Sequence, residues 1–251
     1  MTALPDLATL EAALEASWPA AASRVCGPFR LRDGAGGGQR VSAATAEAET
    51  GAAEIATAEA AMRAAGQRLL FRLRPALCPW DGALDSALAA AGYSRVDPTL
   101  YYVAEVSALA PEPLPGLRVF PIWPPLAIQR DLWAEAGIGP ARLAVMVRAA
   151  GPKAALMARQ DDRVAGTAFI AAIGRVAMLH AVEVTETLRR RGAARNLTRG
   201  AAEWAAGQGA DWLALAVTEA NAPARALYAG LGMVEAGGYH YRVAPEGRPD
   251  A

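Results

Sequence analysis

The sequence is short of the residues that build disulfide scaffolds, metal sites and membrane spans. It contains only 2 cysteines and 2 histidines in 251 residues, too few for a disulfide-stapled fold or a recognisable metal-ligand spacing. No uninterrupted apolar run reaches the about 18 residues that a membrane-spanning helix needs. The amino-terminal stretch mixes acidic and apolar residues in an amphipathic pattern, unlike a secretory signal. We therefore expect a soluble, cytoplasmic protein without a metal cofactor.

The sequence also lacks net charge. Basic and acidic residues number 25 each, so the chain lacks the electrostatic character of a protein that binds nucleic acid or an anionic membrane. Hydrophobic residues make up 53% of the sequence, enough for a packed core in one large domain or two small ones. We expect neither nucleic acid nor membrane as a partner, while monomer and homodimer both remain open.

What the sequence does contain is a strand, a basic loop and a helix in direct succession. Residues 177–184 are mostly apolar and read as a buried strand, and residues 197–206 are rich in helix formers. Between them lies an arginine-rich loop with Gly192, which lets a ligand approach the backbone closely. A helix N-terminus presents unpaired N–H groups to anions. The loop therefore predicts a phosphate site, with a solvated basic turn as the alternative.

The same stretch resembles a known family motif. Val182-x-Val184 followed by Arg189-x-x-Gly192-x-Ala194 is similar to the acyl-CoA loop of the GNAT acetyltransferase superfamily, whose pattern is Arg/Gln-x-x-Gly-x-Gly/Ala.

A second motif lies further along the chain. Residues 221–233 resemble the GNAT signature Asn-x-x-Ala-x-x-Leu-Tyr-x-x-x-Gly-Phe, with Met233 in place of the final phenylalanine. The two motifs occur in the order and at the separation typical of the family. The resemblance covers residues 116–245 well and the first hundred residues only loosely.

The predicted elements of the second half follow the GNAT order. They are a strand at 117–120, helices at 125–137 and 140–150, strands at 153–160, 163–172 and 177–184, a helix at 197–206, a strand at 211–217, a helix at 222–230, and strands within 233–243 separated by two glycines. The resemblance implies an α+β fold with a mixed sheet. It further implies a splay between the central strand and the next one, which admits the pantetheine arm of the cofactor.

Residues 1–107 have their own alternation of predicted strands and helices. We expect helices at 4–18, 47–65 and 81–91, and strands at 24–32, 41–45, 67–74 and 93–106. This part resembles a degenerate GNAT-like half, which makes the chain a tandem; an unrelated small α+β domain is the alternative. Residues 108–116 are proline-rich and predict a linker. A catalytic domain at 117–245 and a flexible tail at 246–251 complete the expected organisation.

The resemblance implies transfer of an acetyl group from acetyl-CoA to a primary amine, on a small molecule or a protein, by direct attack. Arg190 and Arg191 could equally face solvent, and Asn221 could simply cap a helix. The residues implied in cofactor binding are Val182, Val184, Arg189, Arg190, Arg191, Gly192, Ala193, Ala194, Asn221 and Arg225.

The resemblance also implies that Tyr228 protonates the leaving thiolate, because a phenol has an ordinary pKa near 10. The alternative is a buried tyrosine in the core. The family's usual positions for a general base hold Met178 and Ala216 here, so His180, Glu183 and Glu219 remain as candidates. The alternative for His180 is a structural role in the core, because a lone histidine on a buried strand is more often a satisfied core residue. A water chain, or an amine that needs no base, is also consistent with the sequence. A non-catalytic acyl-CoA-binding module is therefore the competing function.

Overall fold

The computed structural model describes residues 3–110 and 118–245, which divide into two compact units. The described residues of unit 1 fall within Met1–Pro19, Tyr101–Val217 and Asn221–Ala236, and those of unit 2 within Ala20–Leu100, Thr218–Ala220 and Gly237–Ala251. The units do not follow the predicted boundary near residue 107, because the first helix packs with the second half of the chain. Most of the predicted linker and the predicted tail at 246–251 lie outside the described residues.

Unit 1 is built on a mixed sheet in the order β11-β5-β10-β9-β8-β7-β6. β9 and β10 run parallel, whereas β6, β7, β8 and β9 pair antiparallel in succession. The predicted α+β fold with a mixed sheet is confirmed. The strands are β5 (Ser94–Glu105), β6 (Val119–Ile122), β7 (Lys153–Gln160), β8 (Arg163–Ile173), β9 (Val176–Val184), β10 (Trp212–Thr218) and β11 (Val234–Val243), of which β5 and β11 also contribute to unit 2.

The hairpin of β7 and β8 follows the sequence prediction closely. Its turn residues, Asp161 and Asp162, have φ angles of +50° and +56°. Two successive residues with positive φ are the backbone signature of the two-residue hairpin turns that match strand twist, and aspartate tolerates this conformation well. The turn brings the start of β8 beside the end of β9, where the basic loop begins.

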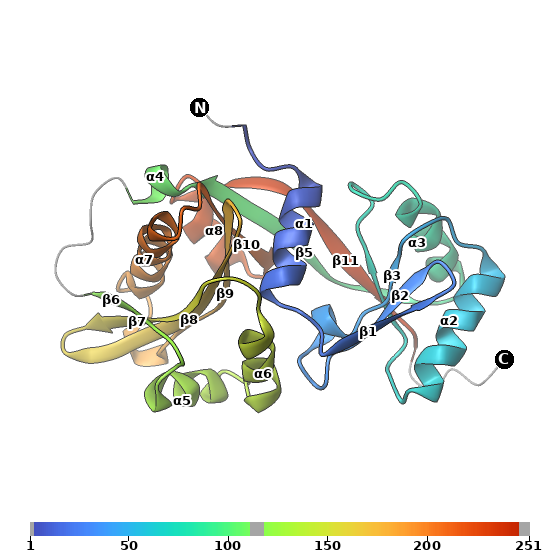
Figure 1. Cartoon of the computed structure of the whole chain (residues 1–251), viewed down its shortest axis with the longest axis horizontal. Coiled ribbons are helices and arrows are strands. Elements are labelled where there is room, and N and C mark those ends of the chain that lie inside the picture. The colour runs from blue at the N-terminus through green and yellow to red at the C-terminus, as the bar shows by residue number, and fades with distance from the viewer. Residues whose placement is uncertain (1–2, 111–117, 246–251) are drawn as a thin grey trace. The chain divides into compact units, whose positions relative to one another are not determined.

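Helices cover both faces of this sheet (Figure 1). α1 and α5 pack against β8 and β9, while α7 packs against β7, β8 and β9. Gly200 allows α7 to approach β6, because a Cβ there would lie 2.6 Å from the Val119 side chain. The helices of unit 1 are α1 (Leu7–Ser17), α4 (Val106–Leu109), α5 (Ala127–Glu135), α6 (Pro140–Arg148), α7 (Ala193–Gly207) and α8 (Ala222–Ala229), with the 3-10 turn η2 (Glu186–Leu188).

Unit 2 combines a small sheet, a strand pair and two helices around an aromatic core. β1, β2 and β3 form a 3-stranded sheet, and β4 pairs antiparallel with β11. Phe29, Phe71 and Tyr93 pack edge to face within the core. The elements are β1 (Ala22–Cys26), β2 (Phe29–Asp33), η1 (Gln39–Val41), β3 (Thr45–Ala46), α2 (Ala52–Ala64), β4 (Leu70–Leu73) and α3 (Asp81–Ala90).

Some predictions for residues 20–100 were wrong. The expected single strand at 24–32 is a hairpin, because Gly27 has a φ of +56° and reverses the chain before Pro28. Of the expected strand at 41–45, only Thr45 lies in β3, while Val41 ends η1 and Ala44 forms an isolated parallel bridge with Phe71. β11 is one continuous strand through the predicted glycine break.

A polar cluster joins α3 to β11 inside unit 2. Asp85 Oδ1 lies 2.9 Å from His240 Nε2 and accepts a hydrogen bond of 2.6 Å from Arg242 Nε. Burial raises the pKa of Asp85, but these hydrogen bonds and positive charges outweigh burial and lower the pKa below its ordinary 3.8. The cluster therefore stabilises unit 2 most when Asp85 is ionised. Among the described residues of the whole chain, no helix has both the length and the apolar character to span a membrane.

Candidate active site

The basic loop ends in an N-terminus of α7 that no side chain caps. Gly192 occupies the N-cap position with φ +90° and ψ 1°, a left-handed conformation that favours glycine. A Cβ built on Gly192 would meet no atom within 4 Å, so the space around this position is open. The structure thus places unpaired N–H groups and the positive end of a helix dipole beside open space. This geometry suits an anionic ligand.

The arginines of the loop point in different directions. Arg189 turns back, and its Nε donates to the carbonyl oxygen of Val184 at 3.3 Å. Arg191 pairs with Asp161 of the β7–β8 turn, with 3.7 Å between charged atoms. Arg190 is exposed and has a φ of +64°. The predicted phosphate ligands are therefore spread around the loop, and their role in binding stays a prediction.

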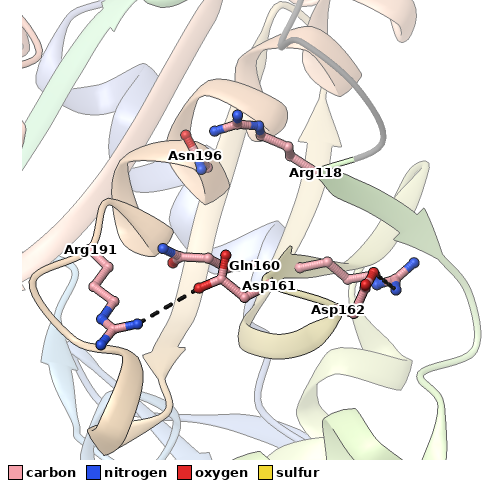
Figure 2. Close-up of a pocket in the computed structure, with 7 residues that line it drawn as sticks. Arg118, Gln160, Asp161, Asp162, Arg191 and Asn196 are labelled. Atoms are coloured by element: carbon pink, nitrogen blue, oxygen red, sulfur yellow. Dashed lines mark hydrogen bonds and ion pairs between the residues drawn. The ribbon is translucent and has the colours of Figure 1, made fainter.

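Figure 2 shows Arg191 reaching toward Asp161 across a cavity of about 380 Å³. Arg118 of the β6 approach and Asn196 of α7 also line this cavity. No local pattern in the sequence indicates that Asp161 of the hairpin turn lies beside the basic loop. The ion pair of Asp161 with Arg191 follows from the antiparallel pairing of β8 with β9, which sets the turn beside the loop. Asp162 pairs instead with Arg159 of β7.

The parallel pairing of β9 with β10 is short. It runs from Val176 opposite Trp212 to Leu179 opposite Leu215 and then stops. β9 continues to Val184 and β10 to Thr218, so their later residues are no longer paired with each other. This divergence is the splay that the sequence resemblance implied. It exposes the backbone edge of β9 next to Val182 and Val184, the residues predicted to pair with pantetheine.

Glu183 and Val184 point to opposite faces of the sheet. Glu183 lies opposite Thr167, and Thr167 Oγ1 accepts a hydrogen bond from Gln129 of α5 at 3.3 Å. Directly opposed residues share a face, so Glu183 is on the α5 face. Val184 packs with Leu188 and Ala193 on the α7 side. The structure therefore settles the face of Glu183, which the sequence left open.

The environment of Glu183 suits a proton acceptor. The side chain is half-buried, and burial raises the pKa of its carboxyl above the ordinary 4.5, against the opposing charges of Arg189 and Arg142. A raised pKa makes the Glu183 carboxylate a stronger base and brings its pKa closer to that of the group from which it would take a proton. This favours general-base catalysis.

Tyr228 of α8 is buried, with 5% of its surface exposed. Burial raises the pKa of Tyr228 to about 12, and the negative charge of Glu183 contributes to the shift. The two predicted catalytic residues are therefore close enough to interact electrostatically. Beside them, the Tyr102 ring lies 6.0 Å from the Tyr228 ring. Tyr228 remains a neutral hydrogen-bond donor across the physiological pH range.

His180 has a different environment from the other two candidates. Its Nε2 lies 2.8 Å from Ser17 Oγ at the end of α1. Its ring packs against Trp18 at 5.0 Å and stacks on Phe169 at 6.1 Å. These buried contacts favour the structural alternative for His180, because its ring is engaged in the packing of α1 onto the sheet.

Asn221 and Arg225 make local contacts around α8. Asn221 Oδ1 accepts a hydrogen bond from the Ala224 N–H at 3.2 Å, so it caps the helix as the alternative interpretation expected. Arg225 Nη2 lies 3.3 Å from Glu235 Oε1, which also accepts a 2.5 Å hydrogen bond from the Tyr102 hydroxyl. The sequence does not predict these contacts with Glu235, since Tyr102 and Glu235 lie far apart along the chain.

Comparison with known proteins identifies the site's family. The model of the Acetyltransferase (GNAT) family matches residues 123–233, which include both sequence motifs. Residues 123–233 therefore form a GNAT acetyltransferase domain. The sequence has no match among the curated proteins with which it was compared.

Solved structures share the GNAT fold over most of the chain. A GCN5-related N-acetyltransferase from Kribbella flavida is 20% identical, with a TM-score of 0.70 and coverage of 98% of both chains. A tandem GNAT protein from the clavulanic acid biosynthesis pathway is 16% identical over 88% of this chain and 79% of its own, with a TM-score of 0.62. A functionally unknown protein from Staphylococcus epidermidis is 12% identical over 82% of this chain and 85% of its own, with a TM-score of 0.58. At these identities the likeness concerns the fold.

Proposed function

We propose that the GNAT domain transfers an acetyl group from acetyl-CoA to a primary amine by direct attack. Family membership supports acyl transfer in general. The proposal rests on one observation above all: the pairing of β9 with β10 ends at Leu179, and Glu183 lies on the part of β9 that continues beyond it. The acceptor is an amine on a small molecule or a protein.

The residues present fit the cosubstrate. The open, uncapped N-terminus of α7 at Gly192 suits a pyrophosphate, and the unpaired edge of β9 at Val182 and Val184 suits the amides of a pantetheine arm. Arg189, Arg190 and Arg191 supply positive charge near the same helix end. Acetyl-CoA contributes the activated thioester, and the chain contributes position and proton transfer.

Glu183 and Tyr228 divide the proton transfers between them. The ionised Glu183 carboxylate takes a proton from the acceptor ammonium, leaving a neutral amine that attacks the thioester carbonyl carbon. As the carbon–sulfur bond breaks, the Tyr228 hydroxyl donates its proton to the sulfur that leaves, and the resulting phenolate takes up the second proton that the attacking nitrogen loses as the amide forms. Protonation of Glu183 also removes the negative charge that raises the pKa of Tyr228. The first transfer therefore makes Tyr228 a stronger acid for the second.

Calorimetric titration with acetyl-CoA, run beside a thiol-release assay over a panel of amines, tests the proposal. We expect stoichiometric binding and thiol release with at least one class of amine. Binding without release across small amines and peptides would favour the non-catalytic acyl-CoA-binding module. Absence of binding would overturn the assignment of the loop and of the splay.

A further inference from the structure

The part of β9 that carries Glu183 holds one residue more than the segment of β8 opposite it. Glu183 pairs with Thr167 and His180 pairs with Phe169, and the register shifts between these pairs. Ala181 has a φ of +50°, which L-residues other than glycine rarely adopt. The extra residue forms a β-bulge, a feature that bends a strand and re-aims the side chains after it.

Trp133 of α5 holds this bulge. Its indole Nε1 donates a hydrogen bond of 2.9 Å to the carbonyl oxygen of Ala181. Trp133 is fully buried, with 0% of its surface exposed, and Ala181 is half-buried, so the bond is partly shielded from competing water. A bulge takes backbone groups out of the regular ladder, and a buried carbonyl without a donor is strongly disfavoured. The indole N–H supplies that donor.

Gln129 fastens the same helix just beyond the bulge. It lies one turn before Trp133 on α5 and is also 0% exposed. Its Nε2 donates to Thr167 Oγ1 at 3.3 Å, and its Oε1 accepts from the Leu126 N–H at 3.0 Å. Two buried polar side chains of α5 therefore bind β9 at the bulge and β8 just beyond it.

The bulge decides where Glu183 points. Side chains alternate between the faces of a sheet, so losing the extra residue from the register would move Glu183 to the opposite face. The bulge also begins where the pairing of β9 with β10 ends, at Leu179. A straightened β9 would be free to extend that pairing and close the splay.

We propose that Trp133 is a positioning residue for the acetyl transfer, whose indole N–H holds the bulge at Ala181 and thereby orients Glu183 and keeps the splay open. This inference rests on the proposed function. It assigns α5 a role beyond covering the sheet, since the helix selects which register of β9 is present.

The test compares Trp133→Phe with Trp80→Phe. Trp80 makes the same kind of bond in unit 2, where its Nε1 donates to the carbonyl oxygen of Ala46 at 3.2 Å. We expect Trp133→Phe to lower kcat/KM about tenfold to a hundredfold and to displace the ascending limb of its pH profile. Trp80→Phe should leave both unchanged. Replacement of Trp133 by 3-benzothienylalanine, which keeps the bicyclic shape and lacks the N–H, separates the hydrogen bond from packing.

Backbone amide hydrogen exchange at residues 181–184 provides a readout that does not need turnover. The proposal expects faster exchange there in both position-133 variants than in Trp80→Phe. Unchanged exchange and an unchanged pH profile in the benzothienyl protein would overturn it. If the wild-type protein neither binds acetyl-CoA nor turns over, the proposed function fails, and the exchange measurement still decides whether Trp133 holds the bulge.

Discussion

Replacing Glu183 by glutamine should slow the reaction and stabilise the fold at the same time. The substitution keeps the shape of the side chain and removes both its charge and its basicity. Loss of a general base lowers kcat/KM by about a hundredfold to ten-thousandfold, which corresponds to about 3–5 kcal/mol of transition-state stabilisation. The loss should fall on turnover, because Glu183 is assigned no contact with the cosubstrate.

The stability effect follows from the raised pKa of Glu183. A carboxyl whose folded pKa lies above its unfolded value of 4.5 retains a proton more readily when the protein is folded. The free energy of unfolding therefore falls as the pH rises from 4.5 to the folded pKa. At neutral pH the ionised, half-buried carboxylate therefore destabilises the protein. Glu183→Gln removes this penalty, and its Tm should exceed that of the wild type at neutral pH. The difference should shrink as the pH falls through the raised pKa of Glu183 toward 4.5, and should be absent well below 4.5.

The assay pairs kcat/KM for thiol release across the pH range with calorimetric unfolding of the same samples. Glu186→Gln is the matched control, because Glu186 is exposed on η2 and should change neither quantity. If Glu183→Gln kept wild-type activity, the base assignment would be wrong. If its Tm fell at neutral pH, the argument from burial would be wrong.

Three further predictions follow from the same structure. Tyr228→Phe should lower kcat/KM by about a hundredfold to ten-thousandfold with an unchanged calorimetric Kd for acetyl-CoA, and a loss of affinity instead would mean a packing role. Gly192→Ala should weaken acetyl-CoA binding and add about 1–2 kcal/mol of backbone strain. Gly174→Ala is the control, because Gly174 also has a positive φ, of +57°, and lies in open space. It should show the strain in urea unfolding without the loss of affinity. Asp85→Asn should lower the free energy of unfolding by about 1 kcal/mol at neutral pH, and the difference should disappear as the pH falls below 3.8; a difference that persists in acid would contradict the ionic origin.

The sequence by itself determined most elements of the GNAT domain. The β7–β8 hairpin, α5, α6 and α8 lie within a few residues of their predicted bounds, because periodicity, proline and glycine act locally. The glycine of the basic loop was predictable in the same way, since Gly192 takes the left-handed φ of +90° that glycine favours. Local signals also suffice for Asn221, where an asparagine before a helix accepts a free N–H of the first turn, here that of Ala224.

Only the tertiary structure decided the geometry of the candidate site. The bulge at Ala181 depends on the register between β8 and β9 and on the Trp133 indole from another element. The face of Glu183 depends on that bulge, and no property of the strand's own residues encodes it. The pairing of Arg191 with Asp161 and the packing of α1 with unit 1 likewise join residues distant in sequence. Such contacts are set by what packs against a segment, which a local pattern does not record.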